Sequence, residues 1–351
     1  MLRWAVVAIA VLVACAPALA ADPDAEEAYA LVARSVWSRD PFPKPEEIAA
    51  ARRVLSAQAA REPSSARWTF ALGRAAGIEA DQAPRDKGAA KREEAVALLE
   101  KAARAQPGNA EYLFWYATAA FERVDDVGML SKMSLASDGR KAYEKAAALD
   151  PHHVGARVGL AQFYLGAPAI AGGSQEKAAA QGQALLAIPG GRGEFQGRMM
   201  LARVAAQQEN WAEMTRQLTA AQSAKGDGAD PLGAMRLLAW NLLNGKKDPQ
   251  SALPVVERYV AAAPADDLTA LFFDGEVKRQ LGRFADALPR YDEVIAKFPD
   301  ARGSRWGAAV CQEQLGKKAE ARKHYEEYAR RFPEDDRAKE ARAAAKRLAG
   351  S

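Results

Sequence analysis

Few residues in this 351-residue chain have types and spacings that could support chemistry. Ser174 and Lys177 have the spacing of a serine nucleophile with a lysine base, but Ser174 also precedes a predicted helix, where serine caps the first turn. His152 and His153 would need a third ligand to hold a metal, and no Cys, His or Asp spacing supplies one. Cys311 has no flanking base and is predicted to be a buried structural thiol. The sequence therefore predicts no catalytic residue, no metal site and no cofactor.

Two stretches near the C-terminus repeat one pattern 34 residues apart. The matched pairs are Leu281-Gly282 with Leu315-Gly316, Ala287 with Ala321, Tyr291 with Tyr325, and Phe298-Pro299 with Phe332-Pro333. The period and pattern resemble the tetratricopeptide repeat, a helix–turn–helix unit. The resemblance covers residues 268–333 and extends over 66–264. It implies units that stack to bury their apolar faces and together form a concave surface.

Prolines at predicted helix ends divide the chain into units, because proline cannot continue a helix. They are Pro63, Pro107, Pro151, Pro189, Pro264, Pro299 and Pro333. The turn Gly226-Asp227-Gly228 divides the longest interval between them. Longer stretches at residues 80–90, 125–137 and 167–173 are predicted to be inserted loops on one face of the array.

We therefore predict an all-α fold. The resemblance implies a right-handed tetratricopeptide solenoid of about seven helical hairpins with a C-terminal capping helix. The predicted organisation is a signal peptide at 1–20, an N-terminal helical segment at 21–63, the repeat array at 64–333 and the capping helix at 334–351.

The N-terminus has the features of an export signal. Arg3 precedes an apolar run that is too short to span a membrane comfortably, and Ala18-Leu19-Ala20 forms an A-x-A cleavage pattern. This predicts a periplasmic protein. The alternative is an outer-membrane lipoprotein, because Leu12-Val13-Ala14-Cys15 resembles a lipobox and would make Cys15 the lipidated residue.

The charge balance excludes one class of partner. The chain has 49 basic and 45 acidic residues and a net charge of +4, which is nearly neutral for its length and predicts no nucleic-acid partner. The basic residues after Arg302 alternate with glutamates, which is typical of a solvated helix face with ion pairs.

One row of residues is a candidate binding groove. The resemblance implies that the fifth residue of each unit faces the concave surface. After allowance for insertions, this row is Phe70, Phe114, Val158, Met199, Met235, Phe272 and Trp306. Its apolar character predicts a groove for an amphipathic helix or a lipid. An apolar stripe at helical spacing is also typical of core between helices, so both interpretations stay open here.

A second candidate is the loop after Tyr164, with Pro168, Gly172 and Gly173. It is similar to a loop of some exported bacterial tetratricopeptide proteins, including ones associated with sterol transport. The alternative is a stiff turn between helices, because Gly and Pro are above all turn residues.

The resemblance implies a non-enzymatic scaffold or adaptor that binds a protein partner of the cell envelope. The alternative is a lipid or sterol carrier component, supported by the apolar row, the Gly-Gly loop and Cys15. A carrier would co-purify with extractable lipid, whereas an adaptor would not.

Overall fold

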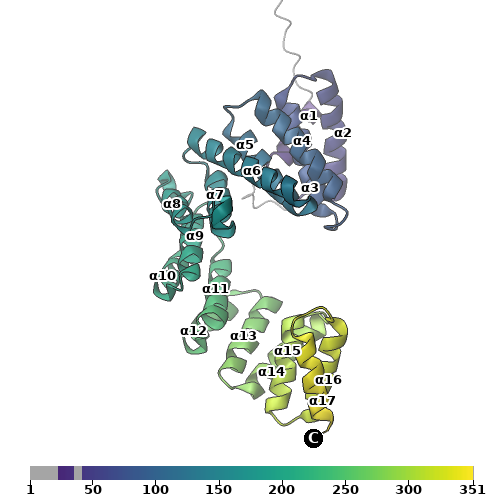
Figure 1. The fold of residues 1–351 in the computed structure, drawn as a ribbon, viewed down its shortest axis with the longest axis vertical. Helices are drawn as coiled ribbons and strands as arrows, with labels where there is room; N and C mark the ends of the chain where they lie inside the picture. The colour runs from purple at the N-terminus through teal and green to yellow at the C-terminus, as the bar shows by residue number, and fades with distance from the viewer. Residues whose placement is uncertain (1–22, 35–41, 351) are drawn as a thin grey trace, which may run out of the picture. The chain divides into compact units, whose positions relative to one another are not determined.

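The chain forms helices throughout the described residues, in two compact units. The computed structural model describes residues 23–34 and 42–350. Unit 1 is residues 1–139 and unit 2 is residues 140–351. The predicted all-α fold is confirmed for the described part of the chain (Figure 1).

Unit 1 begins with two helical pairs. Its helices are α1 (Pro23–Val32), α2 (Pro45–Arg61), α3 (Ala66–Gln82), α4 (Ala89–Ala105) and α5 (Ala110–Arg123), followed by the 3-10 turn η1 (Val124–Asp126). α1 packs against both α2 and α3, around a core that includes Trp68, Ile48 and Leu55. The segment predicted only as N-terminal helices therefore contributes a helical pair of its own to the stack.

α6 (Met129–Leu149) crosses the boundary between the units. The prediction that residues 125–137 form an inserted loop is wrong for residues 129–137, which are the first turns of this helix. Lys132 donates to Asp125 over 2.8 Å and ties the helix start to the preceding turn. The insertion was visible in the sequence from its length, but its helix formers Met129, Leu130, Lys132, Met133 and Leu135 extend α6 into it.

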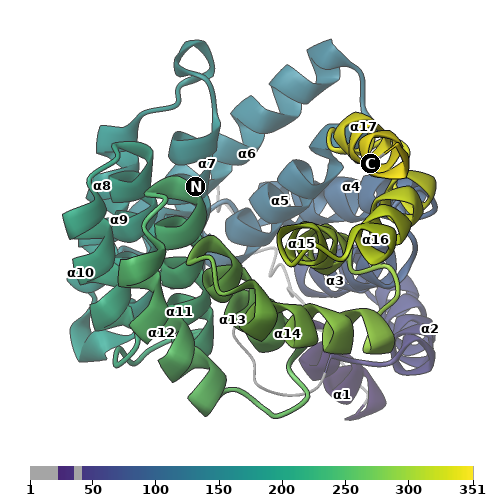
Figure 2. The same ribbon diagram turned by 90° about the horizontal axis from the view of Figure 1, so that it is seen from below.

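Unit 2 consists of five helical pairs and a final helix. The pairs are α7 (Val154–Gly166) with α8 (Gln175–Leu186), α9 (Glu194–Gln207) with α10 (Trp211–Ala221), α11 (Pro231–Trp240) with α12 (Pro249–Ala262), α13 (Leu268–Gln280) with α14 (Phe284–Lys297), and α15 (Arg302–Gln314) with α16 (Lys318–Arg331). α17 (Ala338–Ala349) packs on α16 and closes the stack. Short helical segments are η2 (Ala169–Ala171), η3 (Pro189–Gly191) and the π-helical η4 (Asn241–Gly245). Each helical pair of this unit packs against the next pair along the chain (Figure 2).

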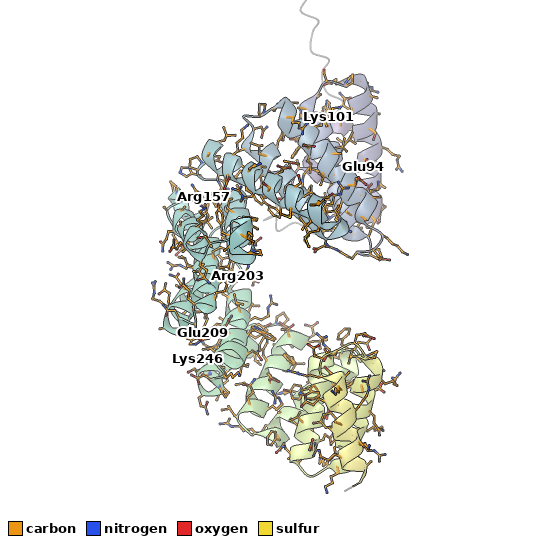
Figure 3. The ribbon with its side chains drawn as sticks, viewed as in Figure 1. Glu94, Lys101, Arg157, Arg203, Glu209 and Lys246 are labelled. Carbon is orange, nitrogen blue, oxygen red and sulfur yellow. The ribbon has the colours of Figure 1, made fainter. Side chains whose placement is uncertain are left out.

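Three helix pairs of unit 2, α9–α10, α13–α14 and α15–α16, share one kind of turn. Gly282 and Gly316 have φ of 76° and 75°, and the residue after each donates its N–H to a carbonyl five residues earlier, as in a Schellman cap. Glu209, labelled in Figure 3, adopts the same left-handed conformation with φ of 53°. The repeated Leu-Gly of the sequence is thus the residue pair that ends a first helix.

Glycines let paired helices approach closely over tyrosine rings. A Cβ on Gly275 would lie 3.1 Å from the Tyr291 ring, and one on Gly307 would overlap the same ring. Tyr291 is therefore held between the first helices of two successive pairs, and its exposed fraction is 0%. Gly159 faces Tyr143 in the same way, with 2.5 Å between its added Cβ and the ring.

A buried hydrogen-bond network fixes the Tyr291 ring. Its hydroxyl donates to Glu276 Oε2 over 2.7 Å, and Arg279 contacts the same carboxylate over 2.5 Å. Burial by itself would raise the pKa of Glu276, but the hydrogen bonds from Arg279, Gln280 and Tyr291 lower it. Glu276 therefore stays ionised, and the buried charge is compensated by donors on three sides.

We predict that Gly307→Ala destabilises unit 2 by about 1–3 kcal/mol, because the methyl group would overlap a ring with no room to move. Urea unfolding followed by circular dichroism measures this. Gly166→Ala is the matched control, since nothing lies within 4 Å of its added Cβ. Equal stability of both variants would contradict the proposed close contact.

Candidate functional site

The two members of the predicted row in unit 1 are buried. Phe70 is 1% exposed and stacks on Tyr112 with 4.4 Å between ring centroids. Phe114 is 6% exposed and its ring lies 4.9 Å from that of Trp115. In this arrangement the two rings are part of the packing of unit 1 and do not offer a free surface.

In unit 2 the first residue of the row is buried, whereas the four that follow are partly exposed. Val158 on α7 is buried, with 6% exposure. Met199, Met235, Phe272 and Trp306 lie on α9, α11, α13 and α15, and all four are partly exposed at the edges of core clusters. The first helices of four successive pairs therefore each present one large apolar side chain that is partly open to solvent. Binding by any of the seven residues stays a prediction.

The partly exposed aromatic residues are held in fixed positions. The Phe272 ring lies 6.2 Å from that of Tyr291, and a Cβ on Gly303 would come within 2.8 Å of it. The centroid of the Trp306 ring lies 5.5 Å from that of Tyr325 and 5.4 Å from that of Tyr328. Such rigid aromatic groups suit binding, because little conformational entropy is lost when a partner covers them.

Polar groups flank these apolar residues. Arg203 follows Met199 by one turn on α9 and is exposed (Figure 3). Arg302 precedes Trp306 by one turn on α15 and pairs with Asp335 over 2.7 Å. An apolar strip with charged residues at its border is the usual composition of a protein-binding surface.

Sequence reasoning missed a cluster of charged residues in unit 1. The guanidinium of Arg74 lies 3.0 Å from the Trp115 ring centroid, and its Nη2 donates to the Arg34 carbonyl over 3.4 Å. Burial raises the pKa of Glu122 to about 7, helped by the nearby Asp81 carboxylate and opposed by Arg74. Burial also lowers the pKa of Arg74 to about 10. No sequence pattern marked these residues, because they meet through the packing of α3 against α5.

We predict that Glu122→Gln changes the pH dependence of stability. The pKa of this residue rises from 4.5 to about 7 on folding, so between these values the folded state keeps a proton that the unfolded state has lost. The free energy of unfolding therefore falls as pH rises through this window. Relative to wild type, the variant should gain roughly 3 kcal/mol between pH 4.5 and pH 8.

Urea unfolding at several pH values tests this expectation. Glu100→Gln is the control, because Glu100 forms a surface pair with Arg104 and should leave the wild-type slope unchanged. If Glu122→Gln kept that slope as well, the buried proton would belong to another group.

The loop between α7 and α8 is a stiff turn with a defined geometry. Tyr164 is buried at 7% exposure, and its hydroxyl donates to Glu144 Oε1 over 2.9 Å. Gly172 has φ of +97°, and Pro168 accepts the N–H of Gly173 over 3.0 Å. A binding role for these residues stays a prediction.

The residues considered for chemistry have structural roles. The Ser174 hydroxyl accepts the N–H of Lys177 over 3.2 Å, so it caps α8 as predicted. Burial raises the pKa of the Cys311 thiol to about 11, which disfavours the reactive thiolate. Within the described ranges, no group of three or more His, Cys, Asp or Glu residues is placed to hold a metal.

Two histidines also have structural roles. His153 caps α7, because its Nδ1 accepts the N–H of Ala156 over 3.2 Å. His324 on α16 is partly buried, and burial lowers its pKa. The charged sequence around His324 did not indicate this burial.

Comparison with known families confirms the repeat. Residues 81–127 and 275–336 match the family model of the tetratricopeptide repeat. These two stretches of the chain are tetratricopeptide repeats. No curated protein matches its sequence.

Two solved structures are similar to this chain in fold. A tetratricopeptide repeat protein from Parabacteroides merdae is 14% identical, with a TM-score of 0.52 over 82% of this chain and 99% of that one. Yeast Tom70 is also 14% identical, with a TM-score of 0.59 over 92% of this chain and 64% of that one. At this identity the likeness extends to the fold alone.

The predicted signal peptide at 1–20 and Cys15 lie outside the described residues. In the part of the chain that the structure describes, no helix is both long and apolar enough to cross a membrane.

Proposed function

We propose that this tetratricopeptide repeat protein is a non-enzymatic scaffold that binds a protein partner of the cell envelope. The observation that carries the proposal is the strip of Met199, Met235, Phe272 and Trp306 on successive first helices of unit 2. Stacked repeats offer a surface far larger than any single helical pair. The large side chains on it supply the few anchors in which binding energy concentrates.

The chemistry of the strip supports a peptide or helix as the occupant. Two methionines adapt to different shapes, while Phe272 and Trp306 are rigid. The spacing of one large residue per first helix suits an extended segment or an amphipathic helix laid across several repeats.

A lipid or sterol ligand has less support. The hollow between α1 and α2 has a volume of about 590 Å³, but Asp24, Glu27, Glu47 and Arg34 are among its lining residues. Burying these charged side chains against an apolar ligand would cost free energy, because they would lose their hydration. We therefore do not propose lipid carriage, and the experiment below distinguishes it from protein binding.

The proposal is tested by capture from an envelope extract. We expect tagged wild-type protein to retain a discrete polypeptide, and the double variant Met199→Glu, Met235→Glu to retain at least tenfold less, because charges would have to be buried in the interface. Phe298→Glu, Leu315→Glu is the control, since both residues are exposed outside the strip. Matching thermal transitions establish that the variants are folded.

Native mass spectrometry with solvent extraction of the same samples separates the two functions. A small-molecule adduct lost in the double variant would establish lipid carriage in place of the adaptor. Absence of any bound species from the wild-type protein would overturn both.

Location in the envelope is a separate part of the proposal, supported by the export signal at 1–20 and its A-x-A site. We expect intact mass measurement of the protein from the envelope fraction to give a chain that begins at Ala21. A diacylated chain that begins at Cys15 would establish the lipoprotein alternative, and an unprocessed cytoplasmic chain would refute export.

A further inference from the structure

An exposed tryptophan lies on α11, one of the first helices that carry the strip. Trp240 is 50% exposed, and its ring lies edge-to-face against Phe273 with 6.5 Å between centroids. The Phe273 ring in turn lies 5.7 Å from that of Phe272, a member of the strip. Trp240 is therefore connected to the strip through a fixed aromatic ring, and it adds a large apolar surface that is half open to solvent.

The backbone that follows Trp240 is held in an unusual conformation. Residues 241–245 form the π-helical turn η4, and such turns occur frequently at functional sites. Asn241 Nδ2 donates to the Leu237 carbonyl over 2.8 Å, and Asn244 Nδ2 donates to the carbonyl of Trp240 over 3.2 Å. Trp240 is thus positioned by Phe273 on one side and by this turn on the other, so little entropy is lost when a partner covers its ring.

The exposed charges beside these apolar groups are basic. Arg203 lies one turn after Met199 on α9 (Figure 3), and Arg236 lies one turn before Trp240 on α11. Both side chains are exposed, and within residues 23–34 and 42–350 neither forms an ion pair with a carboxylate. At the last member of the strip, the exposed Arg337 lies over the Trp306 ring at 5.2 Å.

The acidic side chains near Arg203 and Arg236 already have partners within the chain. Glu194, at the start of α9, accepts two hydrogen bonds from Arg198, over 3.1 and 2.8 Å. Asp230 caps α11. Arg236 lies near the Tyr259 hydroxyl, but the carboxylate there is Asp267, which accepts that hydroxyl over 3.0 Å and also caps α13. The exposed surface around Met199, Met235 and Trp240 therefore has an excess of positive charge.

We propose that the occupant of this surface is an acidic amphipathic helix of a protein partner. Its apolar side chains would cover Trp240 and the strip, and its carboxylates would pair with Arg203 and Arg236. Charge complementarity of this kind selects one partner over others and speeds association. The inference rests on the proposed function, because it specifies the chemistry of the partner that the strip binds.

An anionic membrane is the less favoured occupant of a basic and apolar surface. Recognition of anionic lipid typically uses clusters of about 4–8 basic residues. Arg203, Arg236 and Arg337 are fewer, and they lie on separate helical segments.

Two designed helical peptides with the same apolar face test the charge preference of the full-length chain. One peptide has glutamates along both borders of that face, and the other has lysines at the same positions. Fluorescence anisotropy measures the binding of each. We expect the wild-type protein to bind the glutamate peptide at least about tenfold more tightly, and we expect NaCl at about 0.5 M to reduce this preference, because salt screens exposed charges.

Charge reversal at the two arginines should invert the preference. We expect Arg203→Glu, Arg236→Glu to weaken binding of the glutamate peptide at least about tenfold and to strengthen binding of the lysine peptide. Trp240→Ala should weaken both alike, because it removes apolar contact. The control is Lys318→Glu, Lys323→Glu, which changes the net charge equally at two exposed positions of α16 and should leave both affinities within about threefold. Matching thermal transitions establish that the variants are folded.

Equal affinity for the two peptides, with both lost in Met199→Glu, Met235→Glu, would overturn this inference and leave the proposed function standing. Absence of binding by either peptide would also overturn it, and the capture experiment then decides the proposed function separately. An equal loss in the α16 control would mean that net charge, and not this surface, governs binding.

Two further measurements assign the surface to another occupant if the inference is wrong. Tighter binding to phosphatidylglycerol vesicles than to the glutamate peptide, lost in Arg203→Glu, Arg236→Glu, would identify anionic lipid. Dimers in sedimentation that the same variant abolishes would identify a second copy of the chain.

Discussion

Close approach of helices over buried tyrosine rings is the constraint on which the C-terminal repeats depend. Tyr291 occupies the space that Gly275 and Gly307 leave free on two successive first helices. The ring is thus shared between a helical pair and its neighbour, and its position sets the distance between them. Because protein interiors are packed to crystal-like density, a methyl group on either glycine would force the ring and the two first helices apart.

This packing also explains which side chains can face a partner. A first helix that lies against its own second helix and against the next first helix has only a narrow strip left uncovered. That strip consists of Met199, Met235, Phe272 and Trp306, which remain partly exposed. The remaining side chains of each first helix pack in the core, so few positions on these helices can contact a partner.

The loop between α7 and α8 follows a different principle. Its backbone groups bond to one another and its glycines remove steric conflict, so it is ordered without contributing a hydrophobic core of its own. The stack and the loop are therefore ordered in two different ways, one by helix packing and one by local turn chemistry.

The sequence by itself determined the repeat, because period, small residues and terminating prolines are local properties of each helical pair. It predicted the helices, the Ser174 cap and the buried Cys311, and it gave a stiff turn as one of two interpretations of the loop with Gly172 and Gly173. It could not decide which row residues are core, since burial of Phe70 against Tyr112 depends on residues far along the chain. For the same reason it did not reveal the Arg74–Trp115 contact or the raised pKa of Glu122. These were decided by the tertiary structure alone, because a side chain's neighbours and its access to water depend on the packing of several helices at once.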